Sequence, residues 1–170
     1  MEADIGRRTA IMKGNAKIIE RLNETLVAEF TAIHQYFVHA EMQENWGYVK
    51  LGSFVKKQSI DEMRHAEKLI ERILFFDGVP NMGTLKPMKI GQNVKEQFES
   101  DLALEIEAVG QLNAAIADAV AAGDNGSREL FEFILADEEQ HVDWLEAQLG
   151  AIEDMGLGIY LSQQLADLGA

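Results

Sequence analysis

The topology of this 170-residue chain depends on residues 77–92, DGVPNMGTLKPMKIGQ. This stretch contains both prolines of the sequence, Pro80 and Pro87, together with three glycines. Proline and glycine interrupt helices, so the stretch is predicted to be a loop. The long segments on either side have almost no helix breakers and are predicted to be helical.

Four long helices are predicted, because apolar residues recur at spacings of three and four in each segment. In the first segment this pattern is carried by Leu22, Leu26, Phe30 and Ile33. Asn93 and Glu96 form a plausible capping signature at the start of the third. The predicted ranges are 15–45, 48–76, 93–122 and 127–154, followed by a short fifth helix at 159–168.

The loop at 77–92 is long enough to run the whole length of such helices. A helix of about 30 residues is about 45 Å long, and an extended linker of about 15 residues spans about 50 Å. The other connections are short and make their helices antiparallel neighbours. We therefore expect an all-α, ferritin-like four-helix bundle with one long crossover connection and a short fifth C-terminal helix.

Each long helix is predicted to carry one glutamate on its apolar face. Two of the four add a histidine three residues later, in the units Glu62-Met63-Arg64-His65 and Glu138-Glu139-Gln140-His141. Residues three apart lie one above the other on a helix, so each unit can bind one metal ion from a single helix. The full predicted set is Glu29, Glu62, His65, Glu105, Glu138 and His141.

Four buried carboxylates need compensating positive charge, and two divalent cations would supply it. A donor set of oxygen and nitrogen without sulfur suits iron or manganese. A single Glu-x-x-His unit is more often part of a solvated helix face. Two units on equivalent faces, with one inward glutamate on each remaining helix, are typical of di-iron and di-manganese carboxylate bundles.

Other polar residues lie near this predicted face. Tyr36 and Asp101 are candidates for orienting the ligands, although a core tyrosine with a satisfied hydroxyl explains Tyr36 equally well. His34 and His39 fall off the ligand face and are predicted to be surface or interface residues. Met63 is turned about 100° away from Glu62, and its pattern alone indicates an interface methionine on the outer face.

Composition narrows the possible functions. The chain has no cysteine, which excludes disulfides, thiolate zinc sites, iron–sulfur clusters and a cysteine nucleophile. With 29 acidic and 15 basic residues the net charge is −14, which argues against nucleic acid and anionic membranes and favours cations as partners. With no recognisable secretory or membrane segment, we expect a cytoplasmic protein.

Because Met12-Lys13-Gly14 reads like a start, residues 1–11 are expected to be an extension outside a ferritin-like domain at 12–170.

Six segments carry a family resemblance: residues 12–15, 32–37, 59–66, 101–105, 136–141 and 143–146. Through these segments, from Met12 onward, the sequence resembles the bacterioferritin family. The resemblance implies a hollow shell of 24 subunits that stores a ferric mineral core. It also implies a di-iron ferroxidase centre in each subunit that oxidises Fe(II) with dioxygen or hydrogen peroxide. Its ligands would be the six residues above, with Glu62 and Glu138 bridging the irons and Glu29 and Glu105 terminal.

The same resemblance implies haem b between two-fold related subunits, with Met63 of each subunit as an axial ligand. A small ferredoxin would supply electrons through the haem for iron release. The shell could contain one subunit type or two; the resemblance is compatible with both.

Some relatives hold an extra iron on the cavity side with a histidine and an aspartate. Here Lys57 stands beside Asp61, and because an ammonium group has no lone pair, no such site is expected.

Two other functions compete with iron storage. A di-iron oxidase or peroxidase acting on a small molecule would use the same donor set. A non-catalytic haem-binding or structural bundle would leave the inward glutamates and histidines unexplained.

Overall fold

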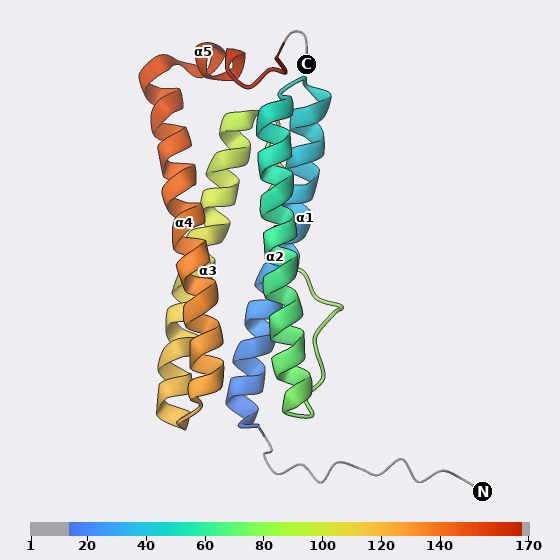
Figure 1. The fold of residues 1–170 in the computed structure, drawn as a ribbon, viewed down its shortest axis with the longest axis vertical. Coiled ribbons are helices and arrows are strands. Elements are labelled where there is room, and N and C mark those ends of the chain that lie inside the picture. Colours follow the sequence, from blue (N-terminus) through green and yellow to red (C-terminus); the bar gives the residue numbers. More distant parts are fainter. Residues whose placement is uncertain (1–13, 168–170) are drawn as a thin grey trace, which may run out of the picture.

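A computed structural model describes residues 14–167 of the chain. Four long helices form a bundle, and a short fifth helix lies across one end of it (Figure 1). The predicted all-α bundle with one long crossover is confirmed. The predicted extension at residues 1–11 lies outside the described residues and stays a prediction. The helices are α1 (Ala16–Asn45), α2 (Val49–Phe75), α3 (Val94–Ala122), α4 (Asn125–Met155) and α5 (Leu157–Ser162).

Two helices, α4 and α5, differ from their predicted ranges by more than one residue at an end. Helix α4 begins at Asn125 because the side chain of Asp124 caps it by accepting from the Ser127 N–H at 3.0 Å. Helix α5 begins at Leu157, directly after Gly156 with its positive φ of 83°. The predicted fifth helix at 159–168 therefore started too late, and it also ran too far, because α5 ends at Ser162; the last predicted residue lies outside the described part.

The start of α3 agrees with the predicted capping signature. The side chain of Asn93 accepts from the Glu96 N–H at 3.0 Å. The Glu96 carboxylate reaches back to the N–H of Gln92 rather than to that of Asn93. The N–H groups of Gln92 and Glu96 thereby have partners where the crossover ends and α3 begins.

The crossover between α2 and α3 is held by a stripe of polar side chains on α1, which lie four or eight residues apart. The Asn23 Oδ1 atom accepts from the N–H of Asn81 at 2.6 Å, and Thr31 Oγ1 accepts from Lys86 at 3.0 Å. Further along, Gln35 Oε1 accepts from Lys89 and His39 Nε2 accepts from Gly91, both at 3.1 Å. These bonds satisfy backbone donors that a long loop would otherwise leave without partners.

The prediction that His39 lies at the surface or in an interface is wrong, because its side chain is 0% exposed. Its Nδ1 lies 3.0 Å from an Asp101 oxygen, and its Nε2 accepts from the Gly91 N–H. The crossover covers this face of α1, which helical periodicity does not reveal. His34 is exposed, as predicted. Gly91 also lets the crossover approach α3, since a Cβ atom there would collide with the backbone of Gln97.

Replacing His39 by alanine is expected to lower the free energy of unfolding by about 2–4 kcal/mol. The buried Asp101 carboxylate loses a donor and the Gly91 N–H loses its acceptor. Denaturant titration of the metal-free protein measures the change. His34→Ala, at an exposed histidine on the same helix, should change stability by less than about 0.5 kcal/mol. Equal losses in both variants would contradict the role given to His39.

Two apolar clusters hold the four helices at different heights. One contains Leu22 of α1, Leu69 of α2 and Phe131 of α4, and the other contains Leu51 of α2 and Phe98 of α3. The inward glutamates lie between these clusters along each helix, so packing on both sides fixes the backbones that carry them. None of the described helices combines the length and the apolar character needed to cross a membrane.

Candidate metal centre

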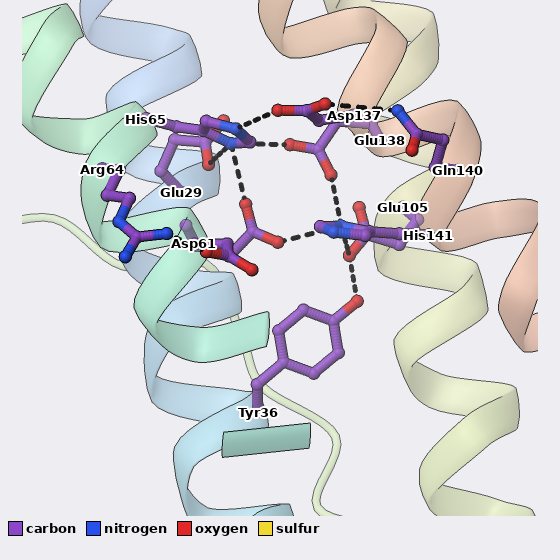
Figure 2. A network of polar contacts seen from close by, with 11 residues as sticks. Glu29, Tyr36, Asp61, Arg64, His65, Glu105, Asp137, Glu138, Gln140 and His141 are labelled. Atoms are coloured by element: carbon purple, nitrogen blue, oxygen red, sulfur yellow. Dashed lines mark hydrogen bonds and ion pairs between the residues drawn. The ribbon is translucent and has the colours of Figure 1, made fainter. Parts of the chain in front are cut away.

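The structure brings the six predicted ligands together in the middle of the bundle (Figure 2). They come from all four long helices, and none is more than 8% exposed. Their donor atoms form two groups, each with all atoms within 4.8 Å of one another. We call Glu29, Glu62, His65 and Glu138 the first cation position. Glu62, Glu105, Glu138 and His141 form the second cation position.

In the first cation position, one imidazole nitrogen faces three carboxylate oxygens. His65 Nδ1 lies 3.0 Å from Glu62 Oε2, 3.3 Å from Glu138 Oε1 and 3.4 Å from Glu29 Oε2. A nitrogen with at most one proton cannot donate to all three oxygens. A cation between them would satisfy the whole group.

The second cation position has the same arrangement with different oxygens. His141 Nδ1 lies 3.0 Å from Glu62 Oε1, 3.1 Å from Glu138 Oε2 and 3.7 Å from Glu105 Oε1. Glu62 and Glu138 thus each have one oxygen facing His65 and the other oxygen facing His141. Glu29 and Glu105 each face one histidine only, so two carboxylates are shared between the positions and two are not.

The residues present fit two divalent cations. Glu29 Oε2 and Glu62 Oε1 are buried, and within the described residues each has no donor of its own, since it faces only a histidine Nδ1 that two other carboxylate oxygens also face. A buried carboxylate oxygen without a donor is costly, and a bound cation removes that cost. Four carboxylates and two imidazoles supply oxygen and nitrogen donors of the kind that iron and manganese accept.

The electrostatics of the centre show the same demand for positive charge. Burial and the nearby Glu138 carboxylate raise the pKa of Glu105 to about 8, and they raise the pKa of Glu29 well above its usual value. Burial lowers the pKa of His141, but hydrogen bonds to the surrounding carboxylates outweigh it and raise that pKa to about 12. The pKa of His65 is raised in the same way. Without metal, the centre therefore retains protons.

The two residues predicted to orient ligands behave differently. The Tyr36 hydroxyl donates to Glu105 Oε1, so this side chain does contact a predicted ligand (Figure 2). Burial, followed by the charge of Glu105, raises the pKa of Tyr36, which keeps the hydroxyl protonated. The Asp101 oxygens instead accept from Gln35 at 2.8 Å and from His39. Asp101, on α3, therefore supports two side chains of the α1 stripe that holds the crossover.

One residue beside the centre was missed by sequence reasoning. Asp137 Oδ2 lies 3.1 Å from His65 Nε2, and Asp137 Oδ1 accepts from the Gln140 side chain at 3.3 Å. Metal-binding histidines commonly donate their outer N–H to a carboxylate. Because Asp137 directly precedes the predicted ligand Glu138, this rule could have identified Asp137 as a candidate partner for a histidine of the centre.

A cavity of about 500 Å³ between α2 and α4 reaches both imidazoles. Asp61 and Arg64, which form an ion pair, line it together with Lys68 and Asp137. Phe133 packs its ring edge-on to His65 in the same wall, with ring centroids 5.9 Å apart. Solvent and small solutes can therefore approach the centre from this side.

Met63 lies outside the centre, on the outer face of α2, as its pattern predicted. Its side chain is 54% exposed. It lines a groove of about 570 Å³ whose other walls are mainly apolar. These walls include Phe30, Ile33, Ile60, Ile70 and Met82.

Comparison with known proteins agrees with this fold. The family described as Ferritin-like domain matches residues 19–155. A bacterioferritin of Mycolicibacterium paratuberculosis is 45% identical over 152 residues, which cover 89% of this chain and 96% of that one. A bacterioferritin of Streptomyces coelicolor is 48% identical over 151 residues, covering 89% and 90%. The solved structure of a mycobacterial bacterioferritin aligns with a TM-score of 0.90 at 43% identity, covering 91% of this chain and 96% of that one.

The bundle and its buried carboxylates and histidines define a ferritin-like protein. Within that class, the chain belongs to the bacterioferritin family.

Proposed function

We propose that this protein stores iron and acts as a ferroxidase, as membership of the bacterioferritin family implies. It oxidises Fe(II) to Fe(III) at the buried centre and deposits a ferric mineral inside a shell of 24 subunits. The observation that carries the proposal is the pair Glu62 and Glu138, whose oxygens face both histidines. We place the protein in the cytoplasm, where Fe(II) is its substrate.

The distances support the roles that we propose for the six ligands. Glu62 and Glu138 bridge two Fe(II) ions, while Glu29 and Glu105 are terminal ligands and each histidine binds through Nδ1. Two Fe(II) ions lose one electron each, and dioxygen or hydrogen peroxide accepts the pair. Tyr36 holds the Glu105 carboxylate in place through its hydroxyl.

The groove around Met63 supports haem b as a second cofactor. An exposed thioether between apolar walls suits a large apolar ring, and thioethers are known haem iron ligands. One methionine per subunit provides two axial ligands only in an isologous dimer, so we place the haem at a two-fold interface. Bound haem would carry electrons inward from a small ferredoxin for iron release.

Replacing Met63 by leucine is expected to remove bound haem almost completely, because leucine preserves volume but provides no ligand. The absorbance spectrum of the purified protein measures haem per subunit. Met155→Leu, at an exposed methionine near the end of α4, is the matched control and should keep the haem. Normal haem content in Met63→Leu would contradict the assignment.

Size-exclusion chromatography with an in-line absorbance spectrum, followed by aerobic addition of Fe(II), tests the proposed function. We expect a large assembly that carries haem absorbance. We also expect rapid oxidation of about two Fe(II) ions per subunit, followed by slower mineral growth. A protein that runs only as a monomer or dimer would contradict iron storage. Rapid oxidation without a mineral would favour a di-iron oxidase acting on a small molecule.

A further inference from the structure

The two histidines of the centre are supported differently at their outer nitrogens. His65 Nε2 bonds Asp137 Oδ2 at 3.1 Å. For His141, residues 14–167 offer no hydrogen-bond partner to Nε2, and its ring borders the cavity between α2 and α4. The centre is therefore asymmetric beyond its six ligands.

Asp137 is itself held in place. The Gln140 side chain donates to Asp137 Oδ1 at 3.3 Å (Figure 2). It also donates to the Ala136 carbonyl at 3.0 Å. With the Nε2–H of His65 donating to Asp137, the Nδ1 atom faces the oxygens of the first cation position. A cation that displaces the Nδ1 proton would meet the Nδ1 lone pair without any turn of the ring. One histidine is thus oriented for a cation before the cation arrives.

The terminal carboxylates show a second asymmetry in the same direction. Glu29 Oε2, in the first cation position, faces only His65 Nδ1 in the described part of the chain, 3.4 Å away, whose proton a cation would displace. Glu105 Oε1, in the second position, already accepts from the Tyr36 hydroxyl. A cation entering the second position must share that oxygen with Tyr36, whereas one entering the first position finds its terminal oxygen available.

We infer that Asp137 is a positioning residue that makes the first cation position the tighter of the two, so that this position fills first. The inference rests on the proposed function and deepens it by giving the order of loading. A ligand that is already oriented loses less rotational freedom when the cation binds. A carboxylate partner at Nε2 also makes Nδ1 more basic and therefore a stronger metal ligand. Among the described residues His141 has no such partner at Nε2, so its ring is held by hydrogen bonds at Nδ1 alone.

Anaerobic titration of the assembled, metal-free protein with Co(II) tests the order, with visible absorbance reporting the ligands around each ion. We expect two Co(II) ions per subunit in two resolved steps, the first tighter than the second. Asp137→Ala should weaken the first step by about 10–100-fold and shift its absorbance bands, with the second step little changed. Asp137→Asn, which keeps the shape and a weaker acceptor, should give a smaller loss.

Glu139→Gln is the matched control, because it removes one negative charge from the exposed neighbour of the same helical turn. It should bind Co(II) like the wild type, and the thermal unfolding midpoints of all metal-free variants should agree closely. A single wild-type step, an Asp137→Ala titration like that of Glu139→Gln, or an equal loss in both steps would overturn the inference. Failure of the proposed centre is distinguishable from these results, since a wild type that binds no Co(II) would refute the centre and the inference together.

Discussion

Replacing Glu138 by glutamine is expected to slow rapid aerobic Fe(II) oxidation by more than about 100-fold. Glu138 turns one oxygen to His65 and the other to His141, so both cation positions lose a charged donor together. Loss of an outer-shell partner alone typically reduces affinity or activity by about 10–100-fold, and loss of a shared ligand should exceed that. Glutamine keeps the volume and a carbonyl oxygen, so the buried site should still pack.

Glu139→Gln provides the control for this experiment as well. It makes the same chemical change one residue away, at an exposed position. The initial rate of Fe(III) formation after mixing with about two Fe(II) ions per subunit is the measurement, made on assembled protein. We expect Glu139→Gln to oxidise iron at the wild-type rate. Wild-type kinetics in Glu138→Gln would rule out the shared-ligand role.

The stability of the metal-free protein is expected to fall as the pH rises from about 5 to about 8. The folded protein holds a proton on Glu105 up to its pKa of about 8, while the unfolded chain releases it near 4.5. The His141 pKa is raised from 6.5 to about 12, which acts in the same direction above pH 6.5. In each case the stabilisation is complete below the unfolded pKa and is lost as the pH approaches the folded one. Each extra proton held by the folded state contributes about 1.4 kcal/mol per pH unit.

Zn(II) should counteract this loss, because it replaces the protons that the centre otherwise retains. Metal binding to these ligands releases protons, so the affinity grows as the pH rises. At a free concentration about 100 times the dissociation constant, the metal adds about 2.7 kcal/mol of stability. Thermal unfolding midpoints across this pH range, with a chelator or with Zn(II), measure both effects.

A glutamate outside the centre serves as the comparison. Glu107→Gln changes a half-exposed residue paired with Lys86 and should leave the pH dependence intact. Glu105→Gln should flatten part of it. A metal-free wild type whose stability is constant or rises over this range would contradict retention of protons at the centre.

Part of the centre was predictable because helical periodicity is a local property. Residues three or four apart share a face in any helix, so the two Glu-x-x-His units and the two remaining glutamates could be placed inward before any packing was known. Proline and glycine act on their own backbone, so the crossover at residues 77–92 was equally readable. The one long loop then sufficed to define the bundle.

The features that sequence reasoning missed depend on contacts between distant segments. Asp137 meets His65 across 72 positions of the sequence, and that contact depends on how α2 and α4 are rotated against each other. The crossover covers one face of α1, which buries His39 and draws Asp101 toward it. No local pattern contains that information, because an uncovered helix would present the same residues to solvent.

By itself, then, the sequence determined which helices form, where the crossover runs and which six side chains point inward, since these follow from local backbone preferences and from the 3.6-residue turn. Only the tertiary structure decided which carboxylate oxygen faces which histidine and which histidine has a partner at Nε2. It also decided that Asp101 binds Gln35 and His39 and not a ligand of the centre. These outcomes depend on distances of about 3 Å between atoms of different helices. Such distances are set when the two apolar clusters pack and hold the helices at one rotation and one height.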